Sequence, residues 1–160
     1  MELSIIVPIY NVEDYLEECL KSLYNIKNIK LEIILVNDGS KDNSFKIMEK
    51  FKEIYPEKTV LINKENGGLS SARNAGMKAA VGEYISFIDS DDFIERTMLE
   101  DLYCASNNHD IIFSDFIFSA KKELLKVNNS SSYIIPSLKK RLFFNKNSLL
   151  YILFQTTVLP

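Results

Sequence analysis

The sequence lacks several residues that common protein classes depend on. Of its 160 residues none is tryptophan, two are cysteine (Cys19 and Cys104) and His109 is the single histidine. Two cysteines do not make a disulfide framework, and one histidine excludes zinc sites that need several histidines. A serine–histidine–aspartate triad would have to use His109, which lies in a predicted loop. We therefore expect any bound metal to have oxygen ligands.

Long apolar segments are missing as well. No apolar run approaches the roughly 18 residues that a membrane-spanning helix needs. A signal peptide would need a basic segment before its apolar region, and no basic segment precedes the first apolar run. We therefore expect a cytoplasmic protein. With 46% hydrophobic and 26% charged residues, the composition is that of an ordinary globular domain.

The charge is unevenly distributed along the chain. The net charge is −3, but residues 121–160 carry +6 and residues 1–120 carry −9. The acidic first part argues against nucleic-acid binding. The basic segment predicts peripheral contact with the inner face of the cell membrane, and a solvated protein surface is the alternative.

Apolar runs alternate with helical periodicities over most of the chain. Strands are predicted at residues 3–8, 31–36, 59–62, 83–88 and 111–118. Helices are predicted at about residues 11–23, 42–55, 69–80 and 97–106. Asn11 is the expected N-cap of the first helix, Cys19 is expected in its core face, and the third helix has a face of small residues. This order predicts an α/β fold with a mostly parallel sheet and helices on both faces.

The last 40 residues follow a different pattern. A loop is predicted at residues 128–132, followed by two short helices at residues 137–144 and 147–154. These helices would form a short helical tail after the α/β part.

Three polar clusters follow predicted strands, at residues 8–11, 37–40 and 89–91. In parallel sheets, ligands bind beyond the carboxyl ends of the strands, so these clusters are expected to meet. Asp89 and Asp91 would repel each other unless a divalent cation neutralised them, and Mg²⁺ or Mn²⁺ suits carboxylate oxygens. Asp38 is suited to accept hydrogen bonds from a base or a ribose.

Two further features fit the same ligand. Gly67 and Gly68 let the backbone approach a ligand closely, and Arg73 is placed to reach a phosphate. Each feature alone is typical of a solvated turn or a surface ion pair. Together they indicate binding of a metal-bound nucleoside diphosphate.

Four blocks of the sequence resemble the family 2 glycosyltransferases, which have the GT-A fold, a Rossmann-like α/β architecture. The blocks are SIIVPIYN at residues 4–11, EIILVNDGSKD at 32–42, NGGLSSARNAG at 66–76 and GEYISFIDSDD at 82–92. They occur in the family's order and spacing, and the resemblance covers about residues 3–105.

The resemblance implies a donor-binding set at the matching positions: Pro8, Tyr10, Asp38, Gly68, Arg73, Asp89, Ser90 and Asp91. Pro8 and Tyr10 would lie near the nucleotide base, and Asp38 would bind the base or the ribose. Residues 89–91 would be the family's D-x-D motif. Asp91, with Asp89, would hold a manganese or magnesium ion, and Asp89 would be directed more to the ribose or the donor sugar.

The implied activity is inverting transfer of a sugar from a nucleotide sugar, with a UDP-sugar favoured. The acceptor would be a saccharide or a lipid-linked molecule in synthesis of a surface polysaccharide such as a capsule. The resemblance implies a nucleotide-sugar-binding domain at residues 1–120 and the start of an acceptor-side region at residues 121–160.

The family's catalytic base has no counterpart that we can name. It lies in a later part of family members, no acid follows Glu123, and Asp110 and Asp115 do not match its motif. We therefore expect a truncated chain, and a non-catalytic remnant that retains at most nucleotide binding is the alternative function.

Two other α/β classes fit the sequence poorly. A receiver domain needs an acidic pair after the first strand, where Pro8-Ile9-Tyr10-Asn11 stands. A dinucleotide-binding oxidoreductase needs glycines in the first strand-to-helix turn, which has none.

Overall fold

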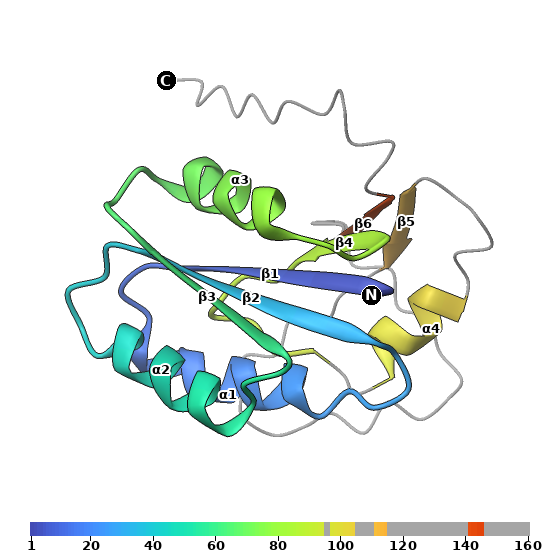
Figure 1. The fold of residues 1–160 in the computed structure, drawn as a ribbon, viewed down its shortest axis with the longest axis horizontal. Coiled ribbons are helices and arrows are strands. Elements are labelled where there is room, and N and C mark those ends of the chain that lie inside the picture. Colours follow the sequence, from blue (N-terminus) through green and yellow to red (C-terminus); the bar gives the residue numbers. More distant parts are fainter. Residues whose placement is uncertain (95–96, 105–110, 115–140, 146–160) are drawn as a thin grey trace, which may run out of the picture.

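The structure is a computed structural model, and it describes residues 1–94, 97–104, 111–114 and 141–145. Its centre is a six-stranded sheet with the order β3-β2-β1-β4-β6-β5 (Figure 1). The strands are β1 (Leu3–Ile9), β2 (Leu31–Asp38), β3 (Thr59–Lys64), β4 (Tyr84–Phe87), β5 (Ile111–Ser114) and β6 (Arg141–Asn145). The helices are α1 (Glu13–Tyr24), α2 (Ser44–Ile54), α3 (Leu69–Ala79) and α4 (Met98–Cys104).

The first four strands form the predicted parallel sheet. β1 pairs in parallel with β2 on one side and with β4 on the other, so that Leu3 lies opposite both Leu31 and Tyr84. The chain runs outward from β1 to β3 and then returns through α3 to β4. The direction of winding therefore reverses between β1 and β4, and this switch point is where ligands bind in such sheets.

The central strands are apolar on both sides because helices cover both faces of the sheet. All seven residues of β1 and all eight of β2 are buried. Leu3, Ile5 and Val7 share a core with α1, α2 and α4, which includes the predicted core residue Cys19. Ile6, which lies between Ile5 and Val7, packs with residues of α3. Figure 1 shows α3 on one face of the sheet and α1 and α2 on the other.

The small residues of α3 let this helix approach the sheet closely, as predicted. A Cβ atom added to Gly76 would lie 2.4 Å from Cγ2 of Ile6. Ala72 of the same helix is also buried. The position of α3, which follows the glycine-rich loop, is therefore fixed by direct contact with β1.

At the amino end of the sheet, the turn between α3 and β4 is tied to β1 and β2. The Ser4 hydroxyl donates to Oε1 of Glu32 (2.5 Å), and the Gly82 amide donates to the Ser4 oxygen (2.8 Å). The Val81 amide also donates to Oε1 of Glu32 (2.7 Å). The buried carboxylate of Glu32 thus has the hydrogen-bond donors that burial demands.

The prediction that Asn11 caps α1 is wrong. The N-cap residue is Val12, and Asn11 adopts a left-handed conformation with φ of +50°. Its side-chain oxygen instead accepts a hydrogen bond from the Lys41 amide (2.8 Å). The reason is that capping groups arrive from the loop before α2.

Asp42 of that loop and Ser44, the first residue of α2, bind the first turn of α1. The Glu13 amide donates to Oδ2 of Asp42 (3.0 Å), and the Val12 amide donates to the Ser44 hydroxyl (3.1 Å). In return, the Asn43 amide donates to Oε2 of Glu13 (2.7 Å). The starts of α1 and α2 therefore cap each other.

We expect Asp42→Asn to lower the stability by about 1 kcal/mol at pH 7 and to weaken its dependence on acid. Burial raises the pKa of Asp42, but hydrogen bonds from Ser44 and the Glu13 amide outweigh it, so the pKa is lowered. A carboxyl group with a lowered pKa stabilises the fold at pH values above its pKa in the unfolded chain, which is about 3.9. This stabilisation is lost as the pH falls through the pKa of the folded state.

Urea unfolding between pH 7 and pH 3 tests this expectation. The control is Asp14→Asn, which removes a charge from an exposed position in the first turn of α1, and it should keep the wild-type pH dependence. An Asp42→Asn variant whose stability falls as steeply in acid as the wild type would contradict it.

The second half of the sheet differs from the prediction. Residues 141–144 were expected in a helix but belong to β6, which pairs antiparallel with both β4 and β5. A short apolar run such as Leu142-Phe143-Phe144 fits either structure, and the open edge of β4 favours the strand. The predicted strand at 111–118 is observed at 111–114, and residues 115–118 lie outside the described residues.

Part of the expected second region therefore extends the same sheet, while the domain boundary at residue 120 stays a prediction. His109, the loop at 128–132 and the helix expected at 147–154 lie outside the described residues. Within the part that the structure describes, no helix has the length and apolarity to cross a membrane.

Candidate nucleotide-binding site

The predicted site residues gather where the four parallel strands end. Tyr10 directly follows β1 and is 47% exposed, while Asp38 is the last residue of β2. Asp89 follows β4 by two residues. Pro8 lies inside β1, is buried and faces Val36 in the register. The structure thus brings these residues to one edge, and their roles in binding stay predictions.

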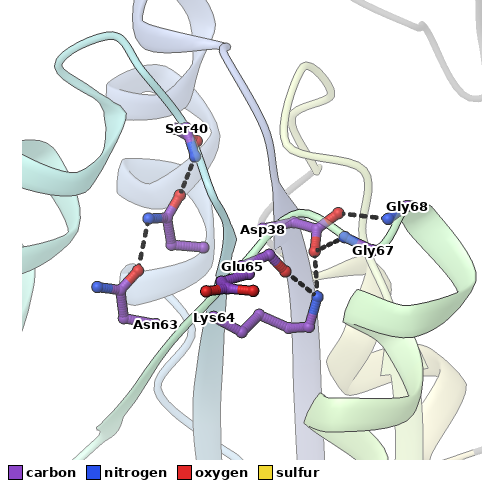
Figure 2. A network of polar contacts seen from close by, with 8 residues as sticks. Asp38, Ser40, Asn63, Lys64, Glu65, Gly67 and Gly68 are labelled. Atoms are coloured by element: carbon purple, nitrogen blue, oxygen red, sulfur yellow. Dashed lines mark hydrogen bonds and ion pairs between the residues drawn. The ribbon is translucent and has the colours of Figure 1, made fainter.

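Asp38 lies at the centre of a network of polar contacts (Figure 2). Its Oδ1 accepts hydrogen bonds from the Gly67 amide (3.0 Å) and from the ammonium group of Lys64. Its Oδ2 accepts a hydrogen bond from the Gly68 amide (2.8 Å). The side chain is only 4% exposed. This carboxylate therefore connects the end of β2 to the loop before α3.

These contacts determine the charge of Asp38. Burial raises the pKa of its carboxyl group, but the Lys64 ammonium and the amides of Gly67 and Gly68 outweigh burial and leave the pKa lowered. Asp38 is thus an anion at neutral pH, and both of its oxygens are acceptors.

The turn after Asp38 is held by amide side chains. Asn37 donates to Oδ1 of Asn63 (2.8 Å) and accepts a hydrogen bond from the Ser40 amide (3.0 Å). Gly39 has φ of +74°, and a Cβ atom there would lie 2.8 Å from the Asn66 nitrogen. The turn and the loop before α3 are therefore in direct contact, and only glycine fits between them.

Gly68 is the N-cap residue of α3. Its φ is +82°, and no atom lies within 4 Å of the position that a Cβ would occupy. Glycine is favoured here by the backbone conformation and not by crowding. The space beside Gly68 is open, in agreement with a close approach by a ligand.

Arg73 of α3 connects this loop to the end of β4. Its Nη2 atom donates to Oδ1 of Asp89 (2.9 Å), and its guanidinium group lies 5.6 Å from the centre of the Phe87 ring. Within the described residues, the buried Nε atom of Arg73 has no hydrogen-bond partner. An unsatisfied buried donor carries a free-energy cost, and this one belongs to the side chain that contacts Asp89 beyond β4.

The D-x-D segment presents alternate side chains to solvent. Asp89 is 51% exposed in its side chain, Asp91 is exposed and Ser90 is buried. The Asp92 amide donates to the Asp89 carbonyl (3.0 Å), which closes a turn. The turn is also linked to the core, because the Cys19 thiol lies 3.7 Å from the same carbonyl oxygen.

These residues fit a hard divalent cation. The described residues contain no group of three or more histidine, cysteine or acidic side chains that could hold a metal alone. Two exposed carboxylates match Mg²⁺ or Mn²⁺, which take oxygen ligands and are commonly held by one or two carboxylates together with substrate phosphates. Asp91 and Asp89 are therefore the residues that would hold the ion.

The sequence interpretation missed Lys64, the partner of Asp38. The predicted third strand ends at residue 62, whereas β3 extends to Lys64, two residues before Asn66-Gly67-Gly68. Recognising it required the parallel register in which Asp38 faces Lys64. For the acceptor side, Asp110 and Asp115 lie outside the described residues, and no catalytic base is assigned.

A family model named Glycosyl transferase family 2 matches residues 4–158. The fold and this match show that the chain belongs to the family 2 glycosyltransferases. Among curated relatives, glycosyltransferase GlyA of Streptococcus pneumoniae is 45% identical over 102 residues, which cover 64% of this chain and 14% of GlyA. EpsJ of Bacillus subtilis, described as an uncharacterized glycosyltransferase, is 50% identical over 99 residues, which cover 62% of this chain and 28% of EpsJ.

Solved structures show the same fold. TarS 1–349 of S. aureus in complex with UDP-GlcNAc has a TM-score of 0.62 and 35% identity, over 69% of this chain and 33% of that one. The mannosyltransferase PcManGT from Pyrobaculum calidifontis, in complex with GDP-Man and Mn²⁺, has a TM-score of 0.63 and 25% identity, over 69% and 34%. The chain thus matches a minor part of the length of each of these relatives.

Proposed function

We propose that this chain binds a nucleotide sugar, with a UDP-sugar favoured, together with a divalent cation, for inverting glycosyl transfer in surface-polysaccharide synthesis. The observation that supports this most is the convergence of Asp38, Arg73 and Asp89–Asp91 at the switch point of a family 2 fold. The complex of TarS with UDP-GlcNAc supports the choice of a UDP-sugar.

Each site residue has a distinct task in this proposal. Tyr10 and Asp38 receive the nucleoside, with the exposed ring of Tyr10 beside the base and the Asp38 carboxylate on the base or ribose. Arg73 forms an ion pair with Asp89, and its guanidinium group is suited to the diphosphate. A cation held by Asp91 and Asp89 would offset the charge that develops on the departing diphosphate.

In inverting transfer, an acceptor hydroxyl attacks the anomeric carbon from the face opposite the diphosphate. One carbon–oxygen bond forms, the bond to the diphosphate breaks, and the hydroxyl proton passes to a base. We leave this base unassigned. For the acceptor we propose a saccharide or a lipid-linked molecule. The basic residues after residue 120 support peripheral contact with the anionic inner face of the cell membrane.

Calorimetric titration with UDP tests the proposed donor site. We expect saturable binding in the presence of Mn²⁺ and a loss of affinity of about tenfold or more when EDTA replaces the metal, because the carboxylates and the diphosphate then repel each other. GDP serves as the control nucleotide, and weaker GDP binding would support the uridine preference. A cooperatively folded chain that binds neither nucleotide would overturn the proposal.

A further inference from the structure

Lys64 connects three parts of the candidate site. Its ammonium group donates to Oδ1 of Asp38 and to the Glu65 carbonyl oxygen (2.5 Å). A Cβ atom added to Gly67 would lie 3.0 Å from the same nitrogen, so the ammonium lies directly against the loop. The end of β3, the end of β2 and the loop before α3 thus meet at one charged group (Figure 2).

The burial of this pair makes it different from a surface ion pair. The side chain of Asp38 is 4% exposed and that of Lys64 is 23% exposed. By contrast, Glu17 is 43% exposed and its partner Lys50 is 57% exposed. A buried carboxylate needs its partner far more than an exposed one does, because water cannot replace it.

The contacts of Lys64 continue toward the metal end of the site. Asp38 holds the amides of Gly67 and Gly68, and Gly68 is the N-cap residue of α3. Arg73 lies on the same helix and contacts Asp89 beyond β4. A single series of contacts therefore crosses the sheet edge from β3 through β2 and α3 to the D-x-D segment.

From this geometry we propose that Lys64 is a positioning residue for the nucleotide donor. Through Asp38 and the Glu65 carbonyl, it holds the Gly67–Gly68 loop in the arrangement that receives the nucleoside. The inference rests on the proposed function, since it concerns the donor site. It adds to that function a residue outside the predicted donor-binding set.

The variant Lys64→Met tests this inference. It removes the charge and the donated hydrogen bonds while keeping an unbranched side chain. We expect the Kd for UDP with Mn²⁺ to rise about tenfold or more, as is typical when a group that orients a binding residue is lost. Lys50→Met is the matched control, because it removes the same charge from an exposed pair on α2, and it should bind as the wild type does.

The pH dependence of UDP binding separates positioning from general damage. Among the described residues, the positive charge of Lys64 lowers the pKa of Asp38, and the amides of Gly67 and Gly68 are the other hydrogen-bond donors that lower it. Without Lys64, Asp38 should take up a proton at higher pH. The affinity of Lys64→Met should therefore fall between pH 7 and pH 5 more steeply than that of the wild type, and Lys64→Arg should restore the shallower dependence.

A second measurement needs no nucleotide. In ¹⁵N-labelled protein, the amide signals of Gly67 and Gly68 should shift in Lys64→Met and stay in place in Lys50→Met. Wild-type affinity and pH dependence in Lys64→Met, or unchanged glycine signals, would overturn the inference. Absence of UDP binding by the folded wild type would overturn the proposed function and the donor role together, and the glycine signals would still decide whether Lys64 holds the loop.

Discussion

Replacing Asp91 with asparagine is expected to remove most of the metal dependence of UDP binding. Asparagine keeps the size of the side chain but loses the charge that attracts a hard cation. Because Asp91 is exposed, its loss should leave the fold intact. We expect the affinity for UDP in Mn²⁺ to fall about tenfold or more, toward the affinity that the wild type has in EDTA, because the variant loses a ligand of the ion.

Calorimetry with Mn²⁺ and with EDTA checks this expectation, and thermal unfolding checks the fold. Asp101→Asn is the control, because it removes the same charge from an exposed position of α4. A folded Asp91→Asn variant that binds UDP as the wild type does, with the same response to EDTA, would contradict the assignment of Asp91 as metal ligand.

The largest effect on stability is expected for Gly82→Ala. A Cβ atom at this position would lie 2.5 Å from the Ser4 nitrogen and 2.7 Å from the Leu3 carbonyl carbon. These are backbone atoms in the central strand, so they cannot move aside as the end of a side chain can. We expect a loss of about 3 kcal/mol in the free energy of unfolding, at the upper end of the range for overpacking.

Gly68→Ala provides the comparison for this glycine. It has open space around it, and its φ of +82° and ψ of 168° lie in a region that is essentially restricted to glycine. Its cost should therefore be conformational and about 2 kcal/mol. Urea unfolding of both variants separates crowding from backbone conformation. If Gly82→Ala were as stable as Gly68→Ala or more so, the close contact of the α3–β4 turn with β1 would be wrong.

Much of the fold follows from local sequence patterns. The run Ile5-Ile6-Val7 is apolar without alternation, which is typical of a strand covered on both faces, and β1 is such a strand. The alternation of strands and helices also predicts that Asp38 and Asp89 reach the same edge of the sheet. The placement of the candidate site was therefore predictable without knowledge of any side-chain contact.

The features that the sequence could not reveal depend on contacts between distant residues. The first turn of α1 is capped by Asp42, whose carboxylate accepts a hydrogen bond from the Glu13 amide 29 residues earlier in the chain. The pairing of Lys64 with Asp38 spans 26 residues. The strand at Leu142–Phe144 forms because β4 and β5 lie on either side of it. Local propensity carries no information about partners at such separations.

The position of β6 has a consequence for any shorter piece of this chain. Since β6 fills the edge of β4 beside the switch point, a piece ending at residue 120 would leave the backbone amides and carbonyls of Tyr84–Ser86 without the partners at residues 143–145. Exposed strand edges of this kind promote association between molecules. We therefore expect a piece without Arg141–Asn145 to associate more readily than the full chain.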